Sequence, residues 1–258
     1  MSLRTSQYFC MKMNLKKSLF SIVQGHFFRS AKKFCTCVFL VLFVASALGE
    51  ESDEFHYLPG EGGFPEESIP AWRKAGTRPA LIENDRLSVE LRDNQILFWM
   101  LGRKGDEELG EVSAWDLNKT GEGTVTFQLK CHSDTPDANV FSFAVAGERG
   151  LAWVNFYNDH ISFGPGENQT VAHDCENEDV YRMAVSNGKF SLYSKRGGLL
   201  VDQVAMQGGT TNWNLLWFGS TYPFGEKPVE DKTCLRQWEV GFIKWNPHAA
   251  VFEGPEGK

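Results

Sequence analysis

The chain has 258 residues and a formal net charge of −7, and its 8 Trp and 20 Phe help to bring the aromatic fraction to 13%. This length allows one all-β domain or two smaller domains. The acid excess lies after residue 49, where 19 basic and 33 acidic residues give a charge of −14. That excess disfavours nucleic acid and anionic membrane surfaces as partners, because both attract cations. A neutral polymer or a small polar ligand fits the charge better.

Residues 1–49 have the pattern of a secretory signal. They contain seven basic residues and no acid, and the apolar run "FCTCVFLVLFVASALG" follows the basic region. Its strictly apolar part is about a dozen residues long, which is short of the roughly 20 needed to span a bilayer. We therefore expect an exported protein, secreted or held in the periplasm or cell envelope, with no stable membrane span after signal removal. An uncleaved single anchor is the alternative.

Three cysteines follow the signal region, namely Cys131, Cys175 and Cys234. Their spacing matches no zinc pattern. In an exported protein, two of these cysteines can form a disulfide and the third then remains a free thiol. The sequence does not identify which two. Buried free thiols are the alternative.

Residues 50–78 are acidic and interrupted by prolines and glycines. We expect no regular structure there. The segment is interpreted as an extended lead-in that lies over the following domain, with Phe55, Tyr57 and Trp72 as anchors.

Residues 79–246 show the two-residue alternation of β-strands. The alternating apolar positions include Leu87, Val89 and Leu91; Val125, Phe127 and Leu129; Phe141, Phe143 and Val145; and Trp238, Val240 and Phe242. The residues Ser186-Asn187-Gly188 separate two further alternating runs. Asn-Gly between such runs is a strong hairpin signal, because both residues tolerate positive φ.

No amphipathic helix of twelve or more residues is evident. We therefore predict an all-β fold, an antiparallel two-sheet β-sandwich over residues 79–246, followed by a C-terminal tail at 247–258.

Three stretches resemble one family. The stretches "VYRMAVSNGKFSLYSKRGGLLVDQ", "LLWFGS" and "WEVGFIKW" resemble strands of the concanavalin A-like lectin/glucanase superfamily. The first stretch resembles a hairpin found across that superfamily, including its laminin G-like jelly rolls, and the third resembles the closing strand of many small exported bacterial members. The resemblance implies a jelly roll. It says less about activity, because this superfamily includes lectins, hydrolases and scaffolds.

One departure from the family concerns catalysis. Laminarinase-type members carry Glu-x-Asp-x-x-Glu on one strand, which points two carboxylates to one face. No strand here has that spacing. Glu176 and Glu178 are interpreted as part of a solvated turn, and Glu239 stands alone. Hydrolysis or a lyase reaction at an unrecognised site is therefore the alternative to a non-catalytic role.

The stretch "TNWNLLWFGSTYPFG" places Trp213 and Trp217 four residues apart. In a strand both indoles, with Leu215 between them, share one face. We predict that this face is the core between the sheets. A sugar-binding role holds only if the row lines the exposed side of the concave sheet.

A second row is the preferred ligand-binding candidate. In "AWVNFYNDH" the side chains of Trp153, Asn155 and Tyr157 share one face. This mixture of aromatic and amide groups is less typical of a core than the Val-Phe mixture on the opposite face. We predict that these three residues bind a ligand, and that Trp99 and Trp115 join the same surface.

No cofactor is predicted, although calcium is considered at the loop that holds Asp134, Asp137 and Asn139, because oxygen ligands at close spacing suit a hard cation. Pro136 favours an ordinary surface turn instead.

The main functional hypothesis is an exported, non-catalytic carbohydrate-binding module, monomeric or weakly associated, whose partner is a neutral polysaccharide or glycan and not nucleic acid. Beside the enzyme, a cell-envelope interaction or structural protein remains an alternative.

Overall fold

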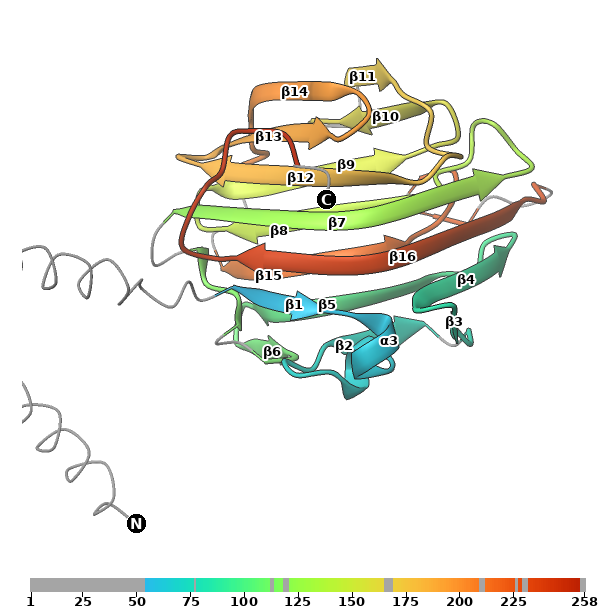
Figure 1. Cartoon of the computed structure of the whole chain (residues 1–258), viewed down its shortest axis with the longest axis horizontal. Coiled ribbons are helices and arrows are strands. Elements are labelled where there is room, and N and C mark those ends of the chain that lie inside the picture. The colour runs from blue at the N-terminus through green and yellow to red at the C-terminus, as the bar shows by residue number, and fades with distance from the viewer. Residues whose placement is uncertain are drawn as a thin grey trace, which may run out of the picture. The chain divides into compact units, whose positions relative to one another are not determined.

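A computed structural model describes residues 54–76, 78–111, 114–117, 121–164, 169–208, 212–225, 227–228 and 232–255. The predicted signal at 1–49 lies outside the described residues. Nearly all regular structure is β, and the strands form two antiparallel sheets of 8 strands each. These sheets pack face to face as a sandwich, which confirms the predicted fold class (Figure 1).

The first sheet, sheet A, has the strand order β14-β13-β12-β7-β16-β4-β3, and β1 also pairs with β16. Its strands are β1 (Phe55–Tyr57), β3 (Leu81–Glu83), β4 (Arg86–Arg92), β7 (Glu122–Ser133), β12 (Asp179–Ser186), β13 (Lys189–Ser194), β14 (Gly198–Ala205) and β16 (Leu235–Asn246).

The second sheet, sheet B, has the order β11-β10-β9-β8-β15-β5-β2, and β6 also pairs with β5. Its strands are β2 (Arg73–Gly76), β5 (Leu97–Lys104), β6 (Glu107–Leu109), β8 (Phe141–Gly147), β9 (Gly150–Phe156), β10 (His160–Phe163), β11 (Gln169–Ala172) and β15 (Trp213–Ser220).

The predicted hairpin is confirmed. It joins β12 to β13 through Asn187 and Gly188, which have φ angles of 53° and 73°. Positive φ at both central residues gives a turn whose twist matches that of the flanking strands. Tyr181 and Met183 on β12 point into the core with 0% exposure.

Aromatic rings join the two sheets. Phe127 of β7 stacks on Phe143 of β8 with ring centroids 4.4 Å apart and an interplanar angle of 3°. Five of the 8 tryptophans lie in the core between the sheets, namely Trp72, Trp99, Trp115, Trp238 and Trp245. Burial of such large apolar side chains is the main source of stability for the sandwich.

The lead-in at 50–78 is more regular than expected. Within its described part, β1 and β2 extend the two sheets, and the short helices α3 (Pro59–Gly62) and η1 (Pro65–Glu67) connect them. The expectation of no regular structure was wrong because proline is tolerated in the first turn of a helix, where its missing N–H has no partner to lose. The anchors are confirmed: Tyr57 and Trp72 are buried, and Phe55 stacks on Trp245.

The alternation predicted for β16 breaks at one residue. A register shift between Val240 and Phe242 leaves Gly241 as a β-bulge. A bulge moves every later side chain to the opposite face. Ile243 and Trp245 therefore enter the core, and the prediction for Phe242 was wrong.

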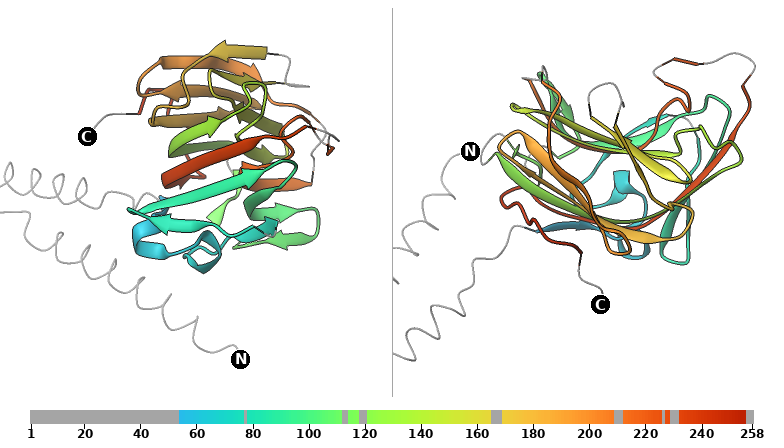
Figure 2. Two further views of the ribbon diagram at one scale, coloured as in Figure 1. Left: turned by 90° about the vertical axis from the view of Figure 1, so that its right-hand side faces the viewer. Right: turned by 90° about the horizontal axis from the view of Figure 1, so that it is seen from above.

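Seen from above in Figure 2, the two sheets curve in the same direction, and the outer face of sheet B is the concave one. The two described helices, α3 and η1, have 4 and 3 residues. Among the described residues, none of the helices has the length and apolarity required to cross a membrane. In the described part of the tail, residues 247–255, the chain contains no strand or helix.

Candidate ligand site on the outer face of sheet B

Apolar and aromatic side chains gather on the outer face of sheet B, away from the core. The strand register places these outward residues side by side: Leu151, Trp153 and Asn155 of β9; Ser142, Ala144 and Ala146 of β8; Trp213, Leu215 and Trp217 of β15; and Phe98 and Met100 of β5. Their apolar members form a second hydrophobic cluster, separate from the one between the sheets. We call this surface the aromatic face.

The centre of the aromatic face is a pair of indoles. Trp153 and Trp217 both flank Ala144 in the register, so their Cα atoms are two strand spacings apart, about 9–10 Å. Their ring centroids are nevertheless only 4.7 Å apart, with an interplanar angle of 33°. Both indoles therefore lean over the small side chain of Ala144. Phe98 continues the row, 5.3 Å from Trp217.

The prediction that Trp213 and Trp217 face the inter-sheet core was wrong. Leu216 and Phe218 occupy that core instead, while Trp213 and Trp217 point outward. The alternation along β15 was read correctly, but both of its faces are apolar, so composition could not tell which one is inside. Trp217 is only 5% exposed because Trp153 and Phe98 cover it.

A buried polar group holds Trp153 in place. The Oδ1 atom of Asn155 accepts hydrogen bonds from Nε1 of Trp153 at 2.7 Å, Nδ2 of Asn139 at 3.0 Å and Oγ of Ser142 at 2.5 Å. Because an indole N–H can only donate, this bond fixes the orientation of the Asn155 amide as well as that of the indole. The ring of Trp153 is thus preorganised on the aromatic face.

The predicted row Trp153, Asn155 and Tyr157 does share the outer side of sheet B. The ring of Tyr157 stacks on His160 at 4.2 Å, beyond the end of β9. On the same face, Ser162 of β10 lies directly opposite Asn155. At the other end of the face, Nζ of Lys104 lies 4.6 Å from the ring centre of Trp213.

Trp99 and Trp115 do not join this surface, and that part of the prediction was wrong. Both are 0% exposed and belong to the core between the sheets. Trp99 alternates with Phe98 on β5 and therefore points inward, where it stacks on Phe218 and donates to Glu66 at 2.7 Å. The unbroken apolar run around β5 gave no alternation from which its inner face could be recognised.

The loop considered for calcium is held by its own hydrogen bonds. Asp134 accepts from the N–H of Leu235 at 2.8 Å and from Thr135 at 3.0 Å. Nδ2 of Asn139 donates to Oδ1 of Asn155 at 3.0 Å. Within the described part of the chain, no group of three or more His, Cys, Asp or Glu residues is arranged to hold a metal. Calcium binding at this loop stays a prediction.

Cys131, Cys175 and Cys234 are free thiols in the structure, and all three are buried. Burial raises the pKa of the Cys131 thiol, and it raises the pKa of the Cys175 thiol to about 12. Neutral, buried thiols of this kind are poor nucleophiles.

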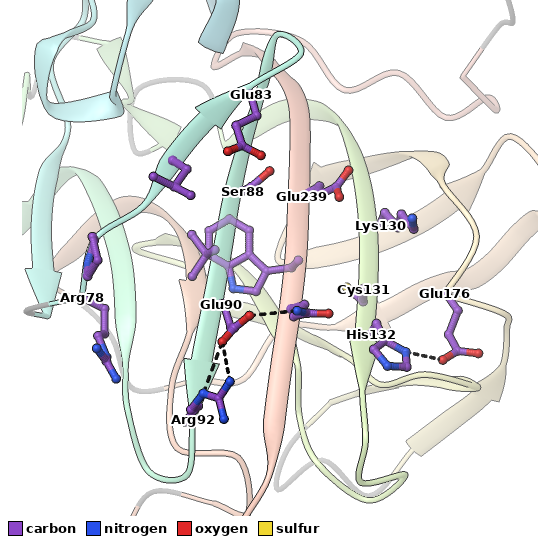
Figure 3. Close-up of a pocket in the computed structure, with 15 residues that line it drawn as sticks. Arg78, Glu83, Ser88, Glu90, Arg92, Lys130, Cys131, His132, Glu176 and Glu239 are labelled. Atoms are coloured by element: carbon purple, nitrogen blue, oxygen red, sulfur yellow. Dashed lines mark hydrogen bonds and ion pairs between the residues drawn. The ribbon is translucent and has the colours of Figure 1, made fainter.

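A hollow lies on the outer face of sheet A (Figure 3). It has a volume of about 940 Å³, and four carboxylates line it, those of Glu83, Glu90, Glu176 and Glu239. Three of them are engaged: Glu176 bonds to Nδ1 of His132 at 2.7 Å, Glu90 accepts from Gln237 at 3.1 Å, and Glu239 lies 4.0 Å from Nη1 of Arg86. The hollow is thus polar, whereas the aromatic face is apolar.

Comparison with known proteins agrees with the fold. No family model and no curated protein sequence matches the chain. A sialidase is similar in structure, with a TM-score of 0.52 and 10% identity, over 75% of this chain and 18% of that one. The Trypanosoma rangeli sialidase in complex with the inhibitor DANA gives 0.50 and 11%, over 76% and 30% of the two chains. The alginate lyase Aly36B gives 0.49 and 9%, over 79% and 99%.

The chain therefore spans less than a third of either sialidase. Identities near 10% show a shared β-sandwich fold and nothing finer. Membership of the concanavalin A-like superfamily stays a prediction.

Proposed function

We propose that the protein is a non-catalytic carbohydrate-binding module and that the aromatic face is its binding surface. The observation that supports this most is the row of Trp153, Trp217 and Phe98, which lies outside the core on the concave outer face of sheet B. Trp153 and Phe98 are half-buried there and cover Trp217, and an apolar surface outside the core often marks a binding site.

A sugar suits this surface chemically. The C–H groups of a pyranose ring pack on flat aromatic rings, while its hydroxyl groups need a few placed polar partners. The aromatic face supplies rings at its centre, and Asn155 and Ser162 supply polar groups beside Trp153.

The charge of the surface favours a neutral glycan. On the described strands β8, β9, β10 and β15, none of the outward side chains is a carboxylate. Near the edge of the sheet, Arg73 pairs with Glu107 at 2.5 Å. Glycoside hydrolysis ordinarily needs two carboxyl groups about 5–9.5 Å apart, and these strands do not present such a pair outward. This supports binding without catalysis.

The test is retention on a broad panel of immobilised neutral polysaccharides. We expect the full chain to bind at least one of them and Trp153→Ala to weaken that binding about 10- to 100-fold, because it removes a central aromatic contact. The matched control is Phe252→Ala, which removes an aromatic ring 43% exposed in the tail and should leave binding unchanged. Absence of retention across the panel contradicts the proposal.

The enzyme alternative would use the hollow on sheet A, where the four carboxylates gather. It predicts that the chain releases new sugar ends from a polysaccharide and that Glu239→Gln, which should not affect the aromatic face, stops the release. The interaction-protein alternative predicts instead that another protein chain covers Trp153.

The proposed location is outside the cell or in its envelope. It rests on the signal pattern of residues 1–49, outside the described residues.

A further inference from the structure

Three polar atoms lie buried beside Trp153 without hydrogen-bond partners. They are Nδ2 of Asn155, Oγ of Ser162 and Oδ1 of Asn139. Their residues are 0%, 3% and 6% exposed. A buried polar group that lacks a partner costs about 1–3 kcal/mol, so such groups are rare and call for an explanation.

Exchanging the Oδ1 and Nδ2 positions of the Asn155 amide would not satisfy its unpartnered donor. Its Oδ1 atom accepts from Trp153, Asn139 and Ser142, at 2.7, 3.0 and 2.5 Å. A flip would direct the Nδ2 hydrogens at the indole N–H, which can only donate. Nδ2 is therefore a fixed donor that requires an acceptor.

The hydroxyl of Ser162 is the neighbour of that donor. Ser162 and Asn155 are directly opposite each other in the β9–β10 register, so both side chains point to the outer face. A hydroxyl group can both donate and accept. Asn155 thus offers a fixed hydrogen-bond donor, and Ser162 offers a hydroxyl group that can donate or accept.

Aromatic rings flank this polar pair along both strands. Trp153 precedes Asn155 by two residues on one side, and the stacked rings of Tyr157 and His160 lie on the other. Gly164, which has no side chain, follows β10 and comes opposite Trp153 when the register is continued. Gly164 therefore places no side chain against the side of Trp153 that faces β10.

The geometry points to Asn155 and Ser162 as the pair that determines sugar specificity, by binding one hydroxyl group of the pyranose that packs on Trp153. This inference rests on the proposed function. The sugar hydroxyl accepts from Nδ2 of Asn155 and exchanges a second hydrogen bond with Oγ of Ser162. Because both atoms are buried in the free protein, the hydroxyl enters between Trp153 and the Tyr157–His160 stack.

The test variant is Ser162→Ala, which removes only the unpartnered oxygen. The probe is the methyl glycoside of the sugar best retained from the neutral panel, compared with its set of monodeoxy derivatives. We expect Ser162→Ala to weaken binding of the parent glycoside about 3- to 10-fold, the usual worth of one hydrogen bond. We also expect the wild type to bind one monodeoxy derivative more weakly than the parent glycoside, by the same factor. The Ser162→Ala variant should bind that derivative as well as it binds the parent glycoside.

Stability separates this role from a structural one. Ser162→Ala should leave the melting temperature unchanged or raise it, because no hydrogen bond within the protein is lost. The matched control is Ser191→Ala on sheet A, whose buried hydroxyl accepts from the N–H of Gln203 at 3.0 Å. That control should lower the melting temperature while the parent-to-deoxy ratio remains that of the wild type.

Two results overturn the inference. One is a Ser162→Ala protein that keeps the parent-to-deoxy ratio of the wild type. The other is a clear loss of stability in Ser162→Ala, which shows that the hydroxyl serves a structural water. In both cases the protein still binds the panel, and Trp153→Ala still weakens that binding. If the proposed function is wrong, no glycan is retained at all, so the two failures are distinguishable.

Discussion

At the scale of single residues, Asp179 shows how the sandwich tolerates a buried carboxylate. Its side chain is 0% exposed, and Nε2 of His173 lies 3.2 Å from Oδ2. Ser194 donates to the same oxygen, and the N–H groups of Val180 and Arg196 donate to Oδ1. Burial alone would raise the pKa of Asp179, but the hydrogen bonds from His173, Ser194 and the two backbone groups outweigh it and hold the pKa below its ordinary value.

A lowered pKa links this carboxylate to acid stability. The ionised form stabilises the fold at pH values above about 3.9, the pKa of an unfolded aspartate, and the contribution is lost as pH falls through the lower folded pKa. We expect Asp179→Asn to be destabilised by about 2 kcal/mol at pH 7. The deficit should shrink below pH 4, because the wild type loses its own advantage there.

Urea denaturation at a series of pH values from 7 to 3 checks this linkage. A deficit that stays constant across the series would show that the charge of Asp179 does not contribute. The readout is independent of any ligand.

At the scale of elements, strand β15 determines where the aromatic face lies. It pairs with β5 on one side and β8 on the other, and its glycine at 219 keeps the backbones close. Gly219 has a φ angle of 132°, and a Cβ there would come within 2.4 Å of the Leu97 carbonyl oxygen and 2.5 Å of the Phe98 Cα. Both neighbours are backbone atoms, so they cannot move aside cheaply.

We therefore expect Gly219→Ala to destabilise the protein by about 3 kcal/mol, since it combines a clash with a disfavoured backbone conformation. It should also weaken glycan binding, because Phe98 is displaced. The matched control is Gly105→Ala, which has a φ angle of 63° but open space around it. That control should cost only about 1 kcal/mol and leave binding intact. Equal thermal stabilities of the two variants would contradict this account.

The same elements show what could be read from the sequence. Period-two patterns found strands such as β4, β7 and β12, and Asn187-Gly188 marked the hairpin, because both signals are local. The row of Trp153, Asn155 and Tyr157 was recognised for the same reason. The outward direction of Trp217 was not, because it depends on which face of β15 meets sheet A.

The polar group beneath Trp153 could not be predicted either. Asn139, Ser142, Asn155 and Ser162 come from three strands and the loop before β8, and only the register of the whole sheet brings them together. Likewise, the bulge at Gly241 depends on pairing with β7, and no local pattern announces it. In each case the missing information was long-range.

At the scale of the whole molecule, the two outer faces of the sandwich differ in character. Sheet A presents charged and polar side chains around a hollow, and sheet B presents aromatic rings with few charges. The 8 tryptophans divide accordingly, with five in the core and three, Trp153, Trp213 and Trp217, on the aromatic face. This division makes tryptophan a direct reporter of where a ligand binds.

Nuclear magnetic resonance of the indole N–H groups, recorded while a bound oligosaccharide fragment from the neutral panel is titrated into the ¹⁵N-labelled protein, tests the central claim most directly. The account predicts that the signals of Trp153 and Trp217 shift in proportion to saturation while those of core residues such as Trp99 and Trp245 stay in place. A shift of the Trp238 signal, whose residue lines the sheet A hollow, with the Trp153 and Trp217 signals unmoved would contradict it.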